Sequence, residues 1–133
     1  GDTRIYWIPD RGSSEEPTEL SVDDSVAQMR IAMGTPRDEA ENGPQAHAIT
    51  KWLGRDSPDF TPRTGSLTVA APGWLLVCSD GLWNYASEAN AIQSLIADLT
   101  SEDPSPLTLA IALVNWANAQ GGKDNISVAL ARL

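Results

Sequence analysis

The chain has 133 residues, of which 41% are apolar and 20% charged, and its formal net charge is -9. This length and composition fit one packed domain, or a large part of one, and argue against a disordered chain. The acidic balance disfavours binding to nucleic acid or to an anionic membrane, because both require a basic surface. The single cysteine, Cys78, excludes an internal disulfide and a cysteine-based zinc site. With no stretch near the roughly 20 apolar residues of a membrane helix, a cytoplasmic protein is expected.

The first half of the chain predicts short strands and helices separated by long polar loops. Strands are expected where apolar and polar residues alternate, and a helix is expected after Ser25, whose hydroxyl can cap it. Segments rich in Pro, Gly and charged residues are expected to be loops. In chain order the expected elements are a strand at 3–8, a turn at 9–14, a strand at 20–22, a helix at 25–33, a loop at 35–45, a helix at 46–53 and a loop at 55–66.

The second half has clearer periodicity. Ile92, Leu95, Ile96 and Leu99 recur at the spacing of an amphipathic helix. The expected elements are strands at 66–70 and 74–79, helices at 87–99 and 107–120, and a final strand at 126–130. Strands and helices do not alternate regularly, which disfavours a doubly wound parallel sheet. An antiparallel α+β fold is therefore predicted.

Three aspartates stand beside Gly or Asn at the margins of expected strands. Asp80 follows an apolar strand and precedes Gly81, Asp124 precedes Asn125, and Asp2 lies just before the first strand. Taken singly, an Asp-Gly pair is usually a turn, and an Asp-Asn pair can be a local hydrogen-bonded turn. Carboxylate oxygens are, however, the preferred ligands of Mg²⁺ and Mn²⁺, and several carboxylates share a site only if a cation offsets their repulsion. The combination favours a divalent-cation site.

Five ordered motifs resemble those of the metal-dependent protein phosphatase 2C (PPM) family. They are Gly1–Arg4, Leu20–Ser25, Ala48–Gly54, Leu76–Trp83 and Gly121–Val128. Their order and spacing match the family across nearly the whole chain. The family usually has Gly-Asp-Ser-Arg, Asp-His-Ser and Ile-Thr-Arg-Ala-Leu-Gly where this chain has Thr3, Asp24 and Lys51-Trp52.

The resemblance implies an α+β fold that is part of an antiparallel β-sandwich flanked by helices. Residues 1–133 would be the C-terminal portion of a single catalytic domain, with a flap-like region at about 23–54 beside the active site. The first expected strand begins almost at once, at residue 3, and the chain starts without methionine. We therefore expect a fragment from which the N-terminal half of the domain is absent.

The resemblance also assigns roles to individual residues. Asp80 and Asp124 would be ligands of one core metal, Asp2 would contribute to a further ion, and Ser79, Gly81 and Asn125 would line the site. The family's cofactors are two or three Mg²⁺ or Mn²⁺ ions, which activate a water molecule for attack on phosphoserine or phosphothreonine, so no protein nucleophile is expected. The lone histidine, His47, is predicted to be structural or exposed.

The implied function is hydrolysis of phosphoserine and phosphothreonine in proteins, in a setting where the phosphatase opposes a Ser/Thr kinase. The family's phosphate-binding arginine and its Asp-Gly-His-Gly segment match nothing in this chain, so the fragment alone is expected to be inactive. Two alternatives stay open. One is a noncatalytic phosphatase-like binding or regulatory module. The other is an acidic cation-binding domain with no link to phosphate, which would leave the other motifs unexplained.

Overall fold

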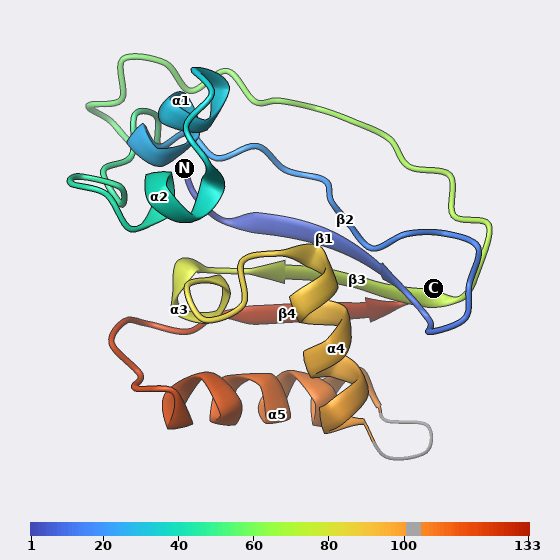
Figure 1. The fold of residues 1–133 in the computed structure, drawn as a ribbon. Coiled ribbons are helices and arrows are strands. Elements are labelled where there is room, and N and C mark those ends of the chain that lie inside the picture. Colours follow the sequence, from blue (N-terminus) through green and yellow to red (C-terminus); the bar gives the residue numbers. More distant parts are fainter. Residues whose placement is uncertain (101–104) are drawn as a thin grey trace. The chain divides into compact units, whose positions relative to one another are not determined.

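The computed structural model describes residues 1–100 and 105–133, which form two compact units. The larger, here called the sheet unit, comprises Thr3–Ser21 and Ser66–Leu133. The smaller, here called the small unit, comprises Gly1–Asp2 and Val22–Gly65. The helices and strands of both units are labelled in Figure 1.

The sheet unit is built on a four-stranded antiparallel sheet with the order β2-β1-β3-β4. The strands are β1 (Arg4–Pro9), β2 (Thr18–Glu19), β3 (Gly73–Cys78) and β4 (Val128–Arg132). In the register, Tyr6 lies opposite both Glu19 and Leu76, and Leu76 lies opposite Leu130. Because neighbouring strands run in opposite directions, the C-terminal end of β3 and the N-terminal end of β4 lie next to each other at the same end of the sheet.

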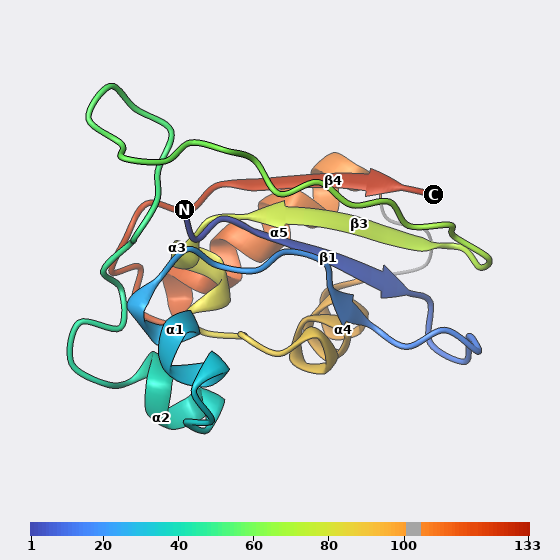
Figure 2. The same ribbon diagram turned by 90° about the horizontal axis from the view of Figure 1, so that it is seen from above.

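Helices cover one face of this sheet. They are α3 (Asp80–Trp83), α4 (Ala89–Leu99) and α5 (Pro106–Ala119), and α4 and α5 lie on the same side of the sheet (Figures 1 and 2). The side chains between the helices and the sheet form one apolar core: Tyr6, Ile8, Trp74, Leu76, Leu82, Ile92, Ile96, Leu109 and Leu113. Ser105 begins α5, and its hydroxyl accepts a hydrogen bond from Thr108 N.

The opposite face of the sheet is apolar and incompletely covered. Ile5, Val77 and Ala129 lie side by side on it in register. Ile5 is 36% exposed, Val77 is half-buried and Ala129 is exposed. An apolar row left open to water is unusual for a sheet, because antiparallel sheets normally place polar residues on a solvated face.

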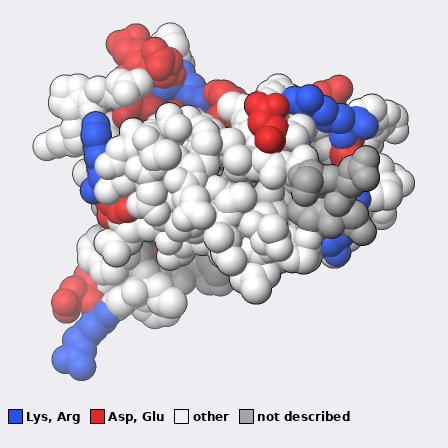
Figure 3. Space-filling view, turned by 90° about the horizontal axis from the view of Figure 1, so that it is seen from below, with Lys and Arg blue, Asp and Glu red and all other residues white. Residues whose placement is uncertain are grey.

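The outer side of the helical layer carries little charge. Figure 3 views the molecule from the α5 side, and uncharged side chains fill the middle of this view. The sequence of α5 contains no Asp, Glu, Lys or Arg. On this face, the described Lys and Arg side chains are scattered at the margins instead of forming the continuous basic patch that binds nucleic acid.

The small unit contains α1 (Val26–Ala32) and α2 (Arg37–Glu41). Ser25 caps α1 by accepting a hydrogen bond from Gln28 N at 3.1 Å, as its place before the helical pattern predicts. Small side chains of both helices pack together with the following turn in a core of Ala27, Ala40 and Ala46.

Most of the predicted elements are confirmed. The structure contains the first strand, the capped helix after Ser25, the strand that ends at Cys78, the two long helices and the last strand. Cys78 is buried and His47 is exposed, as expected. The strand expected at 20–22 lies two residues earlier, at Thr18–Glu19, and the last strand begins at Val128 instead of Ile126.

Three predictions are wrong. The loop expected at 35–45 contains α2, which begins after Pro36 with two acidic residues in its first turn. The helix expected at 46–53 is replaced by turns and by backbone pairing with residues 24–26, where Thr50 N donates to Asp24 O. Residues 66–70 run extended (Figure 1) but pair with no strand among the described residues, so the expected strand does not form, and Ala70 N donates to the side chain of Glu15 instead.

Candidate metal site

Hydrogen bonds hold together the segments that carry Asp80 and Asp124, at the end of the sheet where β3 ends and β4 begins. Ser79 follows β3, and its backbone N donates to Ser127 O at 3.0 Å. Its hydroxyl donates to Asn125 O at 3.0 Å and accepts from Ser127 N at 3.0 Å. Three hydrogen bonds from one residue therefore hold the loop after α5 against the start of α3.

Gly81 allows these two segments to approach closely. A Cβ atom at this position would lie 2.4 Å from the backbone oxygen of Asn125 and 2.9 Å from its carbonyl carbon. No side chain fits at such distances, so the Asp-Gly pair is more than a turn signal. The space beside the glycine is filled by the backbone of Asn125, which places the two predicted motifs in direct contact.

Asp80 and Asp124 project from these joined segments. Asp80 is the first residue of α3 and is half-buried. Asp124 is exposed, and its Oδ1 accepts a hydrogen bond from Asn125 N at 2.7 Å. The structure thus brings together, at one end of the sheet, the two segments that contain five of the predicted site residues: Ser79, Asp80, Gly81, Asp124 and Asn125.

The loop that carries Asp124 is also held at its other end. Lys123 N donates to the hydroxyl of Tyr85 at 3.3 Å, and the Tyr85 ring meets Trp116 of α5 edge to face, with centroids 6.4 Å apart. Gly122 turns the chain out of α5 with a φ of +53°, a left-handed conformation that glycine adopts without strain. The loop is thereby a defined turn fixed to the helical layer.

Asp2 belongs to the small unit, directly before Thr3 and β1. Its membership of the site stays a prediction from the sequence. Within residues 1–100 and 105–133, no three side chains among His, Cys, Asp and Glu come together as a group that could hold a metal ion. The carboxylates of Asp80 and Asp124 nevertheless fit Mg²⁺ or Mn²⁺ chemically, because both ions prefer carboxylate oxygens and accept water at their remaining positions.

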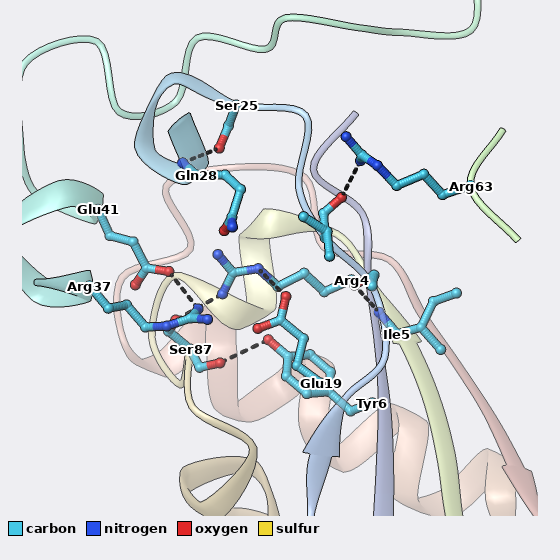
Figure 4. A network of polar contacts seen from close by, with 12 residues as sticks. Arg4, Ile5, Tyr6, Glu19, Ser25, Gln28, Arg37, Glu41, Arg63 and Ser87 are labelled. Atoms are coloured by element: carbon cyan, nitrogen blue, oxygen red, sulfur yellow. Dashed lines mark hydrogen bonds and ion pairs between the residues drawn. The ribbon is translucent and has the colours of Figure 1, made fainter. Parts of the chain in front are cut away.

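A buried polar cluster behind α3 was not predicted from the sequence. The guanidinium of Arg4, only 2% exposed, lies 3.6 Å from the ring centroid of Trp83, the last residue of α3. Its NH1 donates to Ser87 Oγ at 2.8 Å, and its Nε lies 3.6 Å from Glu19 Oε1 (Figure 4). The available signal was the strand period, which places this charged residue on the same face as Tyr6 and Ile8.

Tyr6 completes this cluster. Burial raises the pKa of its phenol well above the ordinary range, so the group stays protonated. Its hydroxyl donates to Ser87 O at 2.9 Å (Figure 4). The turn between α3 and α4 is therefore bound to β1 twice at Ser87, through its side chain and through its backbone.

Residues 23–54, which the resemblance predicts to be a flap-like region, lie in the small unit and form ion pairs with Asp59 and Arg63 of the same unit. Arg63 NH1 lies 2.7 Å from Asp24 Oδ1 and donates to Val22 O at 2.8 Å. Lys51 forms an ion pair with Asp59, and this contact, together with a hydrogen bond from Thr61 N, lowers the pKa of the Asp59 carboxyl. Asp24 stands where the family usually has histidine, and here it pairs with Arg63.

Known proteins resemble this chain over its whole length. Protein phosphatase PhpP of Streptococcus pneumoniae is 35% identical over 135 residues, covering 100% of this chain and 50% of the relative. The Streptococcus agalactiae serine/threonine phosphatase is 31% identical with a TM-score of 0.77, covering 98% of this chain and 50% of the other. The PPM Ser-Thr phosphatase MsPP of Mycobacterium smegmatis is 33% identical with a TM-score of 0.74, covering 98% and 52%. The chain is homologous to these protein phosphatases.

The chain spans about half the length of the curated relatives that it matches. The similar structures share the antiparallel sheet with helices, which confirms the α+β fold implied by the motifs. No protein-family model matches the chain. Among the described residues, no helix has the length and apolar character needed to cross a membrane.

Proposed function

We propose that this chain forms half of the catalytic domain of a metal-dependent protein phosphatase that hydrolyses phosphoserine and phosphothreonine. The observation that carries the proposal is that Ser79 and Gly81 hold the Asp80 and Asp124 segments in contact at one end of the sheet. Both motifs lie in a chain that is 35% identical to a named protein phosphatase. A noncatalytic binding module has no chemical need for two carboxylates there.

In this proposal Asp80 and Asp124 hold one divalent cation, and Asp2 contributes to a further ion of a set of two or three. When bound, Mg²⁺ or Mn²⁺ supplies positive charge for the phosphoryl oxygens and lowers the pKa of water. The chain's own part is to fix the carboxylates. Ser79 and Gly81 hold the two segments together, and Tyr85 holds the loop of Asp124 to the helical layer.

The uncovered face of the sheet is the surface on which the rest of the catalytic domain would pack. The row of Ile5, Val77 and Ala129 is apolar and partly open, and the relatives have about as much chain again beyond the matched half. Residues 66–70, which are extended and lack a neighbouring strand, would become a strand of the second sheet of the expected sandwich. The remaining half would also supply the phosphate-binding arginine and the Asp-Gly-His-Gly segment.

The substrates proposed are Ser/Thr-phosphorylated proteins, which places the phosphatase in a pathway opposite a Ser/Thr kinase in the cytoplasm. Support comes from the relatives, whose names specify serine/threonine phosphatases. MsPP was solved in complex with cacodylate, which is a tetrahedral oxyanion like phosphate.

The test is phosphate release from a phosphothreonine peptide by the complete protein that contains this chain, with Mn²⁺ present or removed by chelation. We expect turnover that requires the metal and is lost in Asp80→Asn and in Asp124→Asn. Asp98→Asn, an exposed carboxylate on α4, is the matched control and should keep full activity. No turnover by the folded wild-type protein would favour the noncatalytic module, and unchanged turnover in both variants would exclude the proposed metal ligands.

A further inference from the structure

The helix that begins with Asp80 is too short to set its own orientation. α3 has four residues, Asp80–Trp83, and no side chain caps its N-terminus. One helical turn forms few internal hydrogen bonds for the backbone freedom that it loses, so isolated turns are unstable. The direction in which Asp80 projects is therefore decided by contacts between α3 and the rest of the sheet unit.

These contacts hold α3 at both of its ends. At the first end, Gly81 packs on the backbone of Asn125 and Ser79 forms its three hydrogen bonds. At the other end, the guanidinium of Arg4 lies 3.6 Å from the ring centroid of Trp83. The same guanidinium donates to Ser87 in the turn that follows the helix. One side chain from β1 thus contacts both the last residue of α3 and the turn that follows the helix. The bond to Ser87 is drawn in Figure 4.

The combined contact with Trp83 and Ser87 requires the chemistry of arginine. A planar guanidinium can lie flat on an indole while its N–H groups donate in the plane to other residues. A lysine ammonium in the same place would keep the charge near Glu19 but would lose the flat contact with Trp83. A buried ion pair is a weak source of net stability because desolvation offsets the attraction. The geometric constraint is therefore the larger contribution of Arg4 to this fold.

We propose that Arg4 is a positioning residue for Asp80: by holding Trp83 and Ser87, it fixes the rotation of α3 and thus the direction of the proposed metal ligand. The inference rests on the proposed function. Arg4 itself touches neither substrate nor metal in this account. Its effect is expected on metal affinity, since residues that orient metal ligands typically change affinity by roughly 10- to 100-fold when they are altered.

The experiment measures Mn²⁺ dissociation constants by calorimetry in the complete protein, without substrate and below the melting temperature of every variant. Arg4→Lys and Trp83→Leu each remove the flat contact, and both should weaken Mn²⁺ binding by about tenfold. The double variant should be no weaker than the worse single one, because both changes break one contact. Trp83→Phe keeps an aromatic face and should bind within about threefold of wild type. Ile92→Val, in the core of α4, is the control for general loss of stability.

The outcomes separate positioning from stability. If Arg4→Lys and Trp83→Leu lower the melting temperature as Ile92→Val does but bind Mn²⁺ like wild type, the inference is wrong. If neither variant folds, as judged by circular dichroism, Arg4 is a stability residue and the inference is also wrong. Asp80→Asn is included to separate the two proposals. Unchanged Mn²⁺ affinity in Asp80→Asn refutes the metal site itself, whereas weakened affinity there but not in Arg4→Lys refutes only the role of Arg4.

Discussion

The hydroxyl of Ser79 donates a hydrogen bond to the backbone oxygen of Asn125 at 3.0 Å, joining the end of β3 to the loop after α5. These two residues come from separate motifs, and each stands next to one of the carboxylates assigned to the metal. The contact brings the segments of two ambiguous sequence signals together at one end of the sheet. Its strength can be tested apart from the chemistry of the carboxylates.

Replacing Ser79 with alanine removes the bond to Asn125 O and leaves Ser127 N without the hydroxyl that accepts from it. We expect the free energy of unfolding to fall by about 1 kcal/mol and Mn²⁺ affinity to fall by roughly tenfold, because the two segments are no longer tied. Urea denaturation and calorimetry measure the two effects. Ser94→Ala, on the exposed side of α4, should change neither quantity. Equal Mn²⁺ affinity in the two variants would show that the Ser79 contact does not serve the site.

Gly81→Ala inserts a methyl group 2.4 Å from the backbone oxygen of Asn125. Because backbone cannot move aside cheaply, we expect a loss of about 1–3 kcal/mol in the free energy of unfolding. Gly65→Ala is the matched control, since a Cβ atom there has nothing within 4 Å and its φ is not in the left-handed region. The urea midpoint of that control should stay the same or rise slightly. If the two alanine variants are equally stable, the close approach at Gly81 does not exist in solution.

The ion pair of Lys51 with Asp59 predicts a pH dependence of known sign. The pairing lowers the pKa of the Asp59 carboxyl in the folded state, so its contribution to stability is present above the ordinary carboxyl pKa of about 3.9 and is lost as the pH falls through the folded-state value. The difference in melting temperature between wild type and Asp59→Asn should therefore be constant near neutral pH and shrink in acid.

The same difference should shrink in high salt, because the Asp59 side chain is 41% exposed and ion pairs that water reaches are screened. Asp56→Asn, which removes a carboxylate of the same loop but leaves this ion pair intact, is the control for the loss of one negative charge. A difference that grows as the pH falls would contradict the pairing.

The elements that the sequence predicted well are those whose cause is local. Ser25 caps α1 through its own hydroxyl, and the Ile92, Leu95, Ile96 stripe of α4 faces the core. The elements that it missed depend on distant partners. Residues 46–53 pair with the 24–26 segment. Residues 66–70 have no strand beside them in the described part of the chain, and an extended segment needs such a neighbour to become a strand.

The sequence singled out the candidate site residues, but it did not reveal the contacts that join their segments. Asp80 and Asp124 were singled out because each stands beside a strand and a small residue. Spacing alone does not reveal contacts between residues far apart in the sequence. Such contacts are those of Gly81 with Asn125 and of Arg4 with Trp83. Arg4 was overlooked because a charged residue near the start of a strand is usually exposed, whereas this one is buried.

The central claim is that Asp80 and Asp124 hold the same divalent cation. The most direct measurement is Mn²⁺ calorimetry on the complete protein as wild type, Asp80→Asn, Asp124→Asn and the double variant. We expect each single substitution to weaken one binding step strongly and the second substitution to add little, since ligands of one ion are not independent. Wild-type affinity in either single variant, or effects that simply add in the double variant, would contradict the shared site.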